Sequence, residues 1–299
     1  PIVRYETVED ELVNRKETLD DFANGIRRFI KGLGKKVLIA NTVGFITTAI
    51  FSETPLVYGF IGSWIGIIAY AIQIYFDFSG YSDMAIGMGK MLGFNYLENF
   101  NFPYIAKSVT DFWRRWHISL STFFRDYVYI PLGGNRVSQL KWIRNVLIVW
   151  TLTGLWHGAN YNFVLWGLYF AVLLILEKLF LQRFLNKLPN IFGHIYLIII
   201  VLFSWAIFRS ESLVELSNII KSMLGINGLG NLNLFYYTGI INIRTILFFT
   251  LGILLSTPIL EKIKIKNTYI KDIILMIIFI LSIIAILTSS YNPFIYFRF

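Results

Sequence analysis

Residues 191–208 read Ile-Phe-Gly-His-Ile-Tyr-Leu-Ile-Ile-Ile-Val-Leu-Phe-Ser-Trp-Ala-Ile-Phe and contain no Asp, Glu, Lys or Arg. An uncharged apolar run of this length is typical of a helix that crosses a lipid bilayer. Six further stretches are rich in apolar residues, and they lie at 37–51, 57–76, 145–157, 161–176, 242–260 and 273–290. The sequence therefore predicts an all-α, polytopic integral membrane protein with about seven spanning segments.

The composition supports this fold class. Hydrophobic residues make up 56% of the 299-residue chain and charged residues only 15%, whereas soluble domains carry about 25% charged residues. The absence of cysteine excludes disulfides and thiolate metal sites. We expect a multi-pass protein of the plasma or inner membrane, in contact with lipid.

The net charge of +9 has a topological explanation. If residues 1–36 are cytoplasmic and each apolar stretch crosses once, the inside segments are 1–36, 77–144, 177–190 and 261–272. They contain 23 of the 27 Lys and Arg residues, as the preference of basic residues for cytoplasmic loops predicts. The basic residues lie in separate loops that flank apolar runs, so we expect no nucleic-acid partner.

Residues 107–144 form an unusual motif region on the predicted cytoplasmic side. Apolar side chains recur there at spacings of three and four, which predicts one amphipathic helix over 110–127. Arg114 and Arg125, eleven residues apart, would share one flank of its apolar stripe. We expect this helix to lie at the membrane interface; the alternative is an amphipathic helix packed on the protein's own core.

The three histidines are the strongest candidates for chemistry. His117 and His157 each follow a tryptophan in or beside apolar sequence, and His194 begins a predicted span. Histidine transfers protons near neutral pH, and ionisable groups in membrane segments are usually functional. The residues alone leave His157 open between a catalytic base and a histidine hydrogen-bonded between helices. With no Cys and no third nearby His, we expect no metal site.

Four stretches carry a resemblance to a known family: Tyr75-Phe-Asp-Phe-Ser-Gly-Tyr-Ser-Asp83, Phe112-Trp-Arg-Arg-Trp-His-Ile-Ser-Leu-Ser121, Arg125-Asp-Tyr-Val-Tyr-Ile-Pro-Leu-Gly-Gly-Asn-Arg136 and Leu155-Trp-His-Gly-Ala-Asn160. They resemble the membrane-bound O-acyltransferase (MBOAT) family, and in particular its alginate O-acetyltransferase-like branch. Family members carry further spanning helices before the motif that matches Pro1-Ile-Val-Arg-Tyr5. The chain thus looks like the C-terminal part of a longer protein, forming one membrane-embedded acyltransferase domain over residues 1–299.

The resemblance implies a function. We expect transfer of an acyl group, most simply acetyl, from a cytoplasmic thioester such as acetyl-CoA towards hydroxyls of an extracytoplasmic polysaccharide. A secreted partner acyltransferase is the alternative acceptor, and no tightly bound cofactor is implied. The resemblance makes His157 the catalytic histidine. It gives His117 a role in substrate orientation or proton transfer, with structural pinning of the interfacial helix as the alternative.

Charged residues near these motifs each have two interpretations. Arg114, Arg115 and Arg125 are candidates to hold the donor's phosphates, because guanidinium groups suit bidentate phosphate contacts; contact with anionic lipid is the alternative. Asp77 and Asp83 are expected to line a channel, pair with an arginine of the 114–125 helix, or lie in an interfacial loop.

Other functions remain open from the sequence. D-alanyl transfer to teichoic acid uses the same family chemistry, although the run Ile130-Pro-Leu-Gly-Gly-Asn-Arg136 favours the acetyltransferase-like branch. A transporter would line a permeation path with the same polar residues, but the sequence shows no internal repeat of the kind common in transporters. A non-catalytic membrane scaffold is the third alternative.

Overall fold

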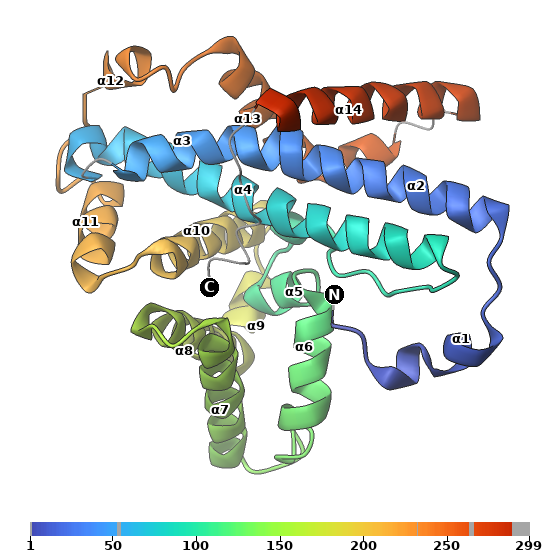
Figure 1. Cartoon of the computed structure of the whole chain (residues 1–299). Coiled ribbons are helices and arrows are strands. Elements are labelled where there is room, and N and C mark those ends of the chain that lie inside the picture. The colour runs from blue at the N-terminus through green and yellow to red at the C-terminus, as the bar shows by residue number, and fades with distance from the viewer. Residues whose placement is uncertain (1, 53–54, 232, 263–265, 289–299) are drawn as a thin grey trace. The chain divides into compact units, whose positions relative to one another are not determined.

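The computed structural model of the chain describes residues 2–52, 55–231, 233–262 and 266–288. Every regular element in these ranges is a helix, which confirms the all-α prediction. The helices gather into two compact units (Figure 1). Among the described residues, unit 1 contains those within 2–49, 69–100 and 235–288, and unit 2 contains those within 50–68 and 101–234.

Two long helices cross the boundary between the units. They are α3 (Asn41–Ser52) and α4 (Pro55–Met91). The other elements of unit 1 are η1 (Tyr5–Thr7), α1 (Glu9–Asn14), α2 (Leu19–Gly34), η2 (Lys35–Ala40), most of α12 (Asn233–Tyr237), α13 (Ile243–Leu255), η6 (Pro258–Lys262) and α14 (Thr268–Thr288). Those of unit 2 are η3 (Pro103–Ile105), α5 (Val109–Trp113), α6 (Ile118–Phe124), η4 (Arg125–Tyr129), α7 (Gln139–His157), α8 (Tyr161–Leu176), η5 (Glu177–Leu181), α9 (Gln182–Leu185), α10 (Asn190–Arg209) and α11 (Leu213–Met223).

In unit 1, α2 packs against the C-terminal half of α4 (Figure 1). The side chain of Thr18 starts α2 by accepting a hydrogen bond from the backbone N–H of Asp21 at 3.0 Å. Glycines face each other across the two helices: a Cβ on Gly32 would lie 2.6 Å from the carbonyl oxygen of Gly80. Small residues at this interface therefore set the close approach of the two backbones.

The two aspartates of the Tyr75–Asp83 motif lie within α4 and not in a loop, because α4 continues to Met91. Asp77 pairs with Lys36, and both side chains are buried. Asp83 accepts from Arg28 at 2.7 Å and from Lys35 at 2.6 Å. The expected pairing with an arginine of residues 114–125 is wrong, since α2 and η2 supply the cations that these buried carboxylates require.

In unit 2, α7 and α8 form a helical hairpin (Figure 1). A Cβ on Gly154 would lie 2.4 Å from the carbonyl oxygen of Phe163, and one on Gly167 would lie 2.2 Å from that of Trp150. The two helices therefore touch backbone to backbone. This contact fixes the end of α7, where His157 lies, against the start of α8.

As far as the structure describes them, the seven apolar stretches lie mainly in helices, but only five helices of the described chain are long and apolar enough to cross a bilayer. They are Leu19–Ser52, Tyr58–Met91, Tyr161–Leu185, Asn190–Arg209 and Thr268–Thr288. The count of seven is too high for two reasons. Residues 145–157 belong to α7, whose first turns carry Lys141 and Arg144, and residues 242–260 divide between the shorter α13 and η6.

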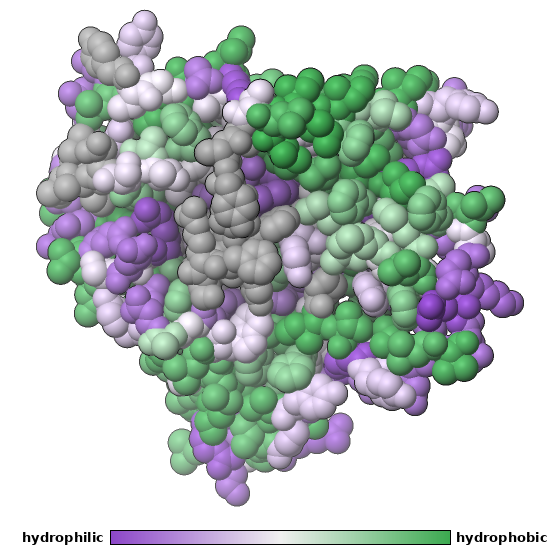
Figure 2. Space-filling model, viewed as in Figure 1, coloured by the Kyte–Doolittle hydropathy of each residue, from purple (hydrophilic) through white to green (hydrophobic). Residues whose placement is uncertain are grey.

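Helix α14 is one of these five helices and has a largely exposed surface. Only 11% of its most apolar 18-residue stretch is buried, and from Ile273 to Leu287 its exposed side chains are all Ile, Leu, Met or Phe. Figure 2 shows them as a continuous apolar face. An apolar face of this extent is expected where a helix contacts lipid.

Candidate active site

The predicted helix over 110–127 is broken at His117. Helix α5 ends at Trp113, and α6 begins at Ile118. Between them His117 has φ 46° and ψ 54°, the left-handed conformation that non-glycine residues rarely adopt. The prediction of one continuous apolar stripe is therefore wrong, and so is the shared flank of Arg114 and Arg125. Strained backbone of this kind is common at functional sites.

His117 lies in a dry, aromatic environment. Its side chain is 3% exposed, its Nδ1 lies 3.4 Å from the hydroxyl of Ser119, and its ring centroid lies 6.0 Å from that of Trp156. Burial lowers the pKa of His117 well below its usual range, and the nearby charge of His157 lowers this pKa further. The imidazole of His117 is therefore neutral at neutral pH.

His157 is the last residue of α7 and is half-buried. Its ring centroid lies 5.1 Å from that of Trp166 and 5.2 Å from that of Phe208, both in edge-on contact. Within the part of the chain that the structure describes, its imidazole makes no hydrogen bond. Within the described residues, the structure therefore shows no partner for a histidine hydrogen-bonded between helices at this position.

The two Trp-His pairs come together in unit 2. Trp156 contacts both imidazoles, since its ring centroid lies 6.0 Å from that of His117 and 5.0 Å from that of His157. The histidines are forty residues apart in sequence, and the left-handed turn before α6 and the end of α7 bring them to one place. Two histidines of the same motif pattern thus share one aromatic environment.

Unit 2 also contains a cavity of about 280 Å³, which neither histidine lines. It is lined by Thr110, Trp113, Leu120, Ser121, Phe124, Arg125, Tyr129, Trp142, Val146, Val149, Trp150, Thr153, Leu174 and Lys178. Trp166, whose ring centroid lies 5.1 Å from that of His157, also contacts two rings of the cavity wall, Trp113 at 5.6 Å and Trp150 at 6.2 Å. The cavity wall is therefore in contact with the residue that packs on His157.

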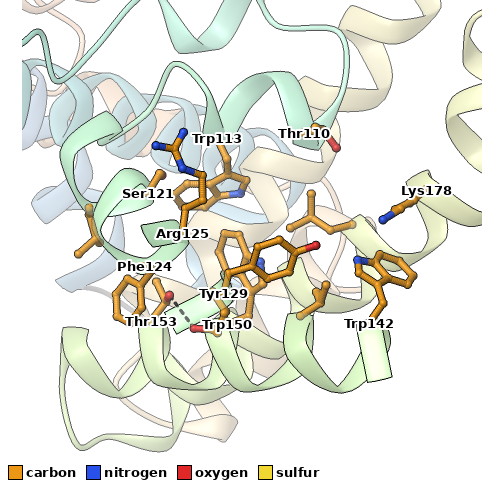
Figure 3. A pocket seen from close by; sticks show the side chains of 14 residues that line it. Thr110, Trp113, Ser121, Phe124, Arg125, Tyr129, Trp142, Trp150, Thr153 and Lys178 are labelled. Carbon is orange, nitrogen blue, oxygen red and sulfur yellow. Dashed lines mark hydrogen bonds between the residues drawn. The ribbon is translucent and has the colours of Figure 1, made fainter. Parts of the chain in front are cut away.

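Aromatic side chains form most of the cavity wall. Figure 3 shows Trp113, Tyr129 and Trp150 between Arg125 on one side and Lys178 on the other. The indole Nε1 of Trp113 is buried and has no hydrogen-bond partner among the described residues. This wall suits an apolar or thioester-containing ligand, with cations available to an anionic group.

The structure separates the three candidate arginines. Arg125 is exposed, lines the cavity and pairs with Asp126 at 2.6 Å. Arg115 pairs with Asp111 at 2.9 Å and does not line the cavity. Arg114 directly follows α5, and its side chain is exposed. Only Arg125 of the three thus lines the cavity.

Sequence reasoning missed a fourth cation. Lys178 lines the cavity, and its Nζ lies 4.1 Å from the ring centroid of Trp142 in a cation–π contact. The available signal was a charged pair, Glu177-Lys178, placed directly after the apolar run 161–176. That position alone is typical of a simple topology signal at a helix end.

Comparisons with known proteins place this geometry in a family. The model of the membrane-bound O-acyltransferase family matches residues 1–214. The probable alginate O-acetylase of Pseudomonas putida is 37% identical over 323 residues, covering 100% of this chain and 66% of that protein. The peptidoglycan O-acetyltransferase of Helicobacter pylori is 38% identical over 76% of this chain and 44% of that protein.

A more distant relative represents the D-alanyl branch. The teichoic acid D-alanyltransferase of Bacillus subtilis is 33% identical over 60% of this chain and 48% of that protein. The chain spans between 44% and 66% of the length of these three relatives. With a family match over more than half its length and five helices able to cross a bilayer, the chain is a multi-pass membrane protein of the membrane-bound O-acyltransferase family.

Proposed function

We propose that the protein transfers an acyl group, most simply acetyl, from a cytoplasmic thioester towards a hydroxyl of an extracytoplasmic polysaccharide. The observation that carries this proposal is His157, an imidazole with no hydrogen bond to the described chain, packed on Trp166, which in turn contacts the cavity residues Trp113 and Trp150. The Pseudomonas putida relative is a probable alginate O-acetylase and the Helicobacter pylori relative a peptidoglycan O-acetyltransferase, which supports the acetyl group.

His157 is the proposed general base. The acceptor hydroxyl oxygen attacks the thioester carbonyl carbon while His157 takes the hydroxyl proton. A C–O bond forms, the C–S bond breaks, and the imidazolium returns the proton to the departing thiolate. A positioned histidine accelerates such a step by about 10²–10⁴-fold. His117 would stay neutral beside it and orient the reacting groups, since its burial opposes a second positive charge.

The cavity is the proposed place of the donor. Its aromatic wall would hold the acyl group and the thioester arm, and Arg125 and Lys178 would hold phosphates of a coenzyme A-like carrier. Exposed Arg114 would add a weaker contact from the end of α5. The donor is a passing substrate in this scheme, and residues 107–144 supply much of its site.

Two alternatives fit the site less well. A permeation path for polar solutes needs a polar lining, whereas tryptophans and aliphatic residues dominate this cavity. D-alanyl transfer would use the same base, but the D-alanyltransferase relative is less similar than the acetylating ones. The acceptor is proposed to be the polysaccharide itself or a secreted partner that passes the acetyl group on.

The test replaces His157 by Ala in the complete protein, expressed in cells that lack the native gene. Acetyl released by mild base from the surface polysaccharide should fall to the level of the deletion strain at a normal amount of membrane protein. Lys187→Gln, an exposed substitution in the same unit, is the matched control. Wild-type acetylation in the His157→Ala strain would refute the assignment.

A further inference from the structure

Glu177 is an ionisable residue that the proposed mechanism does not use. It follows the apolar helix α8, opens η5, and is 1% exposed. Its carboxylate accepts hydrogen bonds from the backbone N–H of Val109 at 2.6 Å and of Thr110 at 2.9 Å. It also accepts from the hydroxyl of Thr110 at 2.8 Å and of Tyr196 at 3.2 Å. A carboxylate this deeply buried needs such partners.

The partners of Glu177 belong to the start of α5. The side chain of Ser108 accepts from the N–H of Asp111 at 3.1 Å, so three successive backbone N–H groups at the beginning of this short helix have acceptors. Two of the three acceptors for these groups come from another helix. The position of α5 along α8 is therefore set by Glu177.

Helix α10 holds the same segment from another direction. His194 Nδ1 lies 3.1 Å from the carbonyl oxygen of Ala106. A Cβ on Gly193 would lie 2.9 Å from the carbonyl oxygen of Lys107, so the backbones approach closely there. Together with the hydroxyl of Tyr196, these contacts anchor the segment 106–110 to α10 and η5.

One face of α8 connects this anchor to the histidine pair. Trp166 and Glu177 are eleven residues apart, which places them about 20° apart around the helix and about 16 Å apart along it. Trp166 contacts the His157 ring at 5.1 Å, and Phe170, between them on the same face, stacks on Phe112 of α5 at 6.4 Å. The helix that contacts His157 thus also anchors the segment that leads to His117.

We propose that Glu177 is a positioning residue for acyl transfer: its hydrogen bonds fix the register of residues 109–117 along α8, and so hold His117 beside His157. The inference rests on the proposed function for its catalytic consequence only. Its structural consequence, the protection of His117, does not require the chain to be an enzyme. Glutamine in place of Glu177 would present an NH₂ group to backbone donors and lose this register.

The test compares Glu177→Gln, Glu177→Asp and Tyr196→Phe with the wild type and with the control Glu211→Gln, an exposed carboxylate of the same unit. The complete protein is purified in detergent, and its monodispersity is checked first. The reaction of each histidine with diethylpyrocarbonate is then followed by peptide mass spectrometry, which the small number of histidines simplifies. Polysaccharide acetylation is measured in parallel.

We expect Glu177→Gln to raise the modification rate of His117 by about tenfold or more, because the segment opens locally. Turnover should fall about 10²-fold, as expected when a reacting group is displaced by about 1 Å. Tyr196→Phe removes one hydrogen bond and should give a smaller loss of about two- to tenfold. Glu177→Asp, which keeps the charge, should recover part of the activity, and Glu211→Gln should match the wild type.

Two results would overturn the inference. One is wild-type protection of His117 in both Glu177→Gln and Tyr196→Phe. The other is loss of activity in Glu177→Gln with His117 still protected, because Glu177 would then act by another route. If His157→Ala keeps full activity while Glu177→Gln exposes His117, the proposed function fails and the positioning role of Glu177 stands.

Discussion

Replacing Gly167 by Ala tests the backbone contact that holds the end of α7 against α8. The added Cβ would lie 2.2 Å from the carbonyl oxygen of Trp150, whereas ordinary contact begins at 3.4 Å. The oxygen belongs to helical backbone and cannot rotate away, so the two helices must separate by about 1 Å. Overpacking of this kind costs about 1–3 kcal/mol of unfolding free energy.

The same separation should reduce activity. Trp150 lines the cavity, and His157 lies two turns further along α7, against Trp166 of α8. Moving α7 from α8 by about 1 Å displaces the base from its substrate, and a shift of this size can cost about 10²-fold in rate. We therefore expect Gly167→Ala to lower the rate of acetylation by about 10²-fold while the folded protein remains the main species.

The assay measures the midpoint of thermal unfolding of the complete protein in detergent, together with polysaccharide acetylation in cells at matched protein level. Leu152→Ala, which shortens an exposed side chain on α7, is the control and should leave both nearly unchanged. Wild-type stability and wild-type acetylation in Gly167→Ala would show that α7 and α8 do not touch as described.

Three further predictions follow from the charged and ionisable groups. Arg125→Ala should raise the KM for the acyl donor several-fold with kcat little changed, and Arg114→Ala should have the smaller effect, because only Arg125 lines the cavity; equal effects in steady-state kinetics would contradict this placement. Burial lowers the pKa of His117 in the folded protein, so the neutral imidazole contributes its full stability above about pH 6.5. Below that pH the unfolding free energy should fall by at most about 1.4 kcal/mol per pH unit. Between pH 7 and pH 5 the unfolding midpoint should therefore fall less in His117→Gln than in the wild type, and an equal fall would refute the burial of His117. Asp77→Asn removes the carboxylate that pairs with the buried Lys36 ammonium and should lower the unfolding midpoint. Lys36→Met in the same variant should restore part of the midpoint, and an unchanged midpoint in Asp77→Asn would contradict the buried pairing.

The fold class could be predicted from the sequence because lipid imposes a simple requirement. A spanning helix must satisfy its own backbone and present apolar side chains, so runs such as 191–208 and 273–290 are visible without any knowledge of contacts. The same reasoning overestimated the number of full-length spans. Residues 145–157 look like a span by themselves, but they belong to α7, whose first turns are charged.

The path of the chain around His117 could not be predicted. Helical periodicity gives the relative directions of side chains only while the backbone stays helical, and one residue at φ 46° ends that relation. The left-handed turn before Ile118 therefore invalidated the predicted flank of Arg114 and Arg125. A non-glycine residue in this conformation carries no local sequence signal.

Local sequence patterns also could not predict which residues pair with the buried charged side chains. Asp83 pairs with residues 48 and 55 positions away, and Glu177 accepts from residues 67 and 68 positions away. Sequence reasoning identified that carboxylates at membrane depth need partners. Which cation or N–H group supplies them depends on how the helices pack, and one sequence does not show this.

The central claim is that His157 takes the proton from the acceptor hydroxyl. The most direct measurement is the rate of thiol release from an acetyl thioester by the purified complete protein, with and without an acceptor oligosaccharide, for the wild type and His157→Gln. This chain contains no cysteine and so adds no thiol background of its own. We expect the acceptor-dependent rate to be lowered by about 10²–10⁴-fold in His157→Gln, with the KM for the donor unchanged. An acceptor-dependent rate equal to that of the wild type would contradict it.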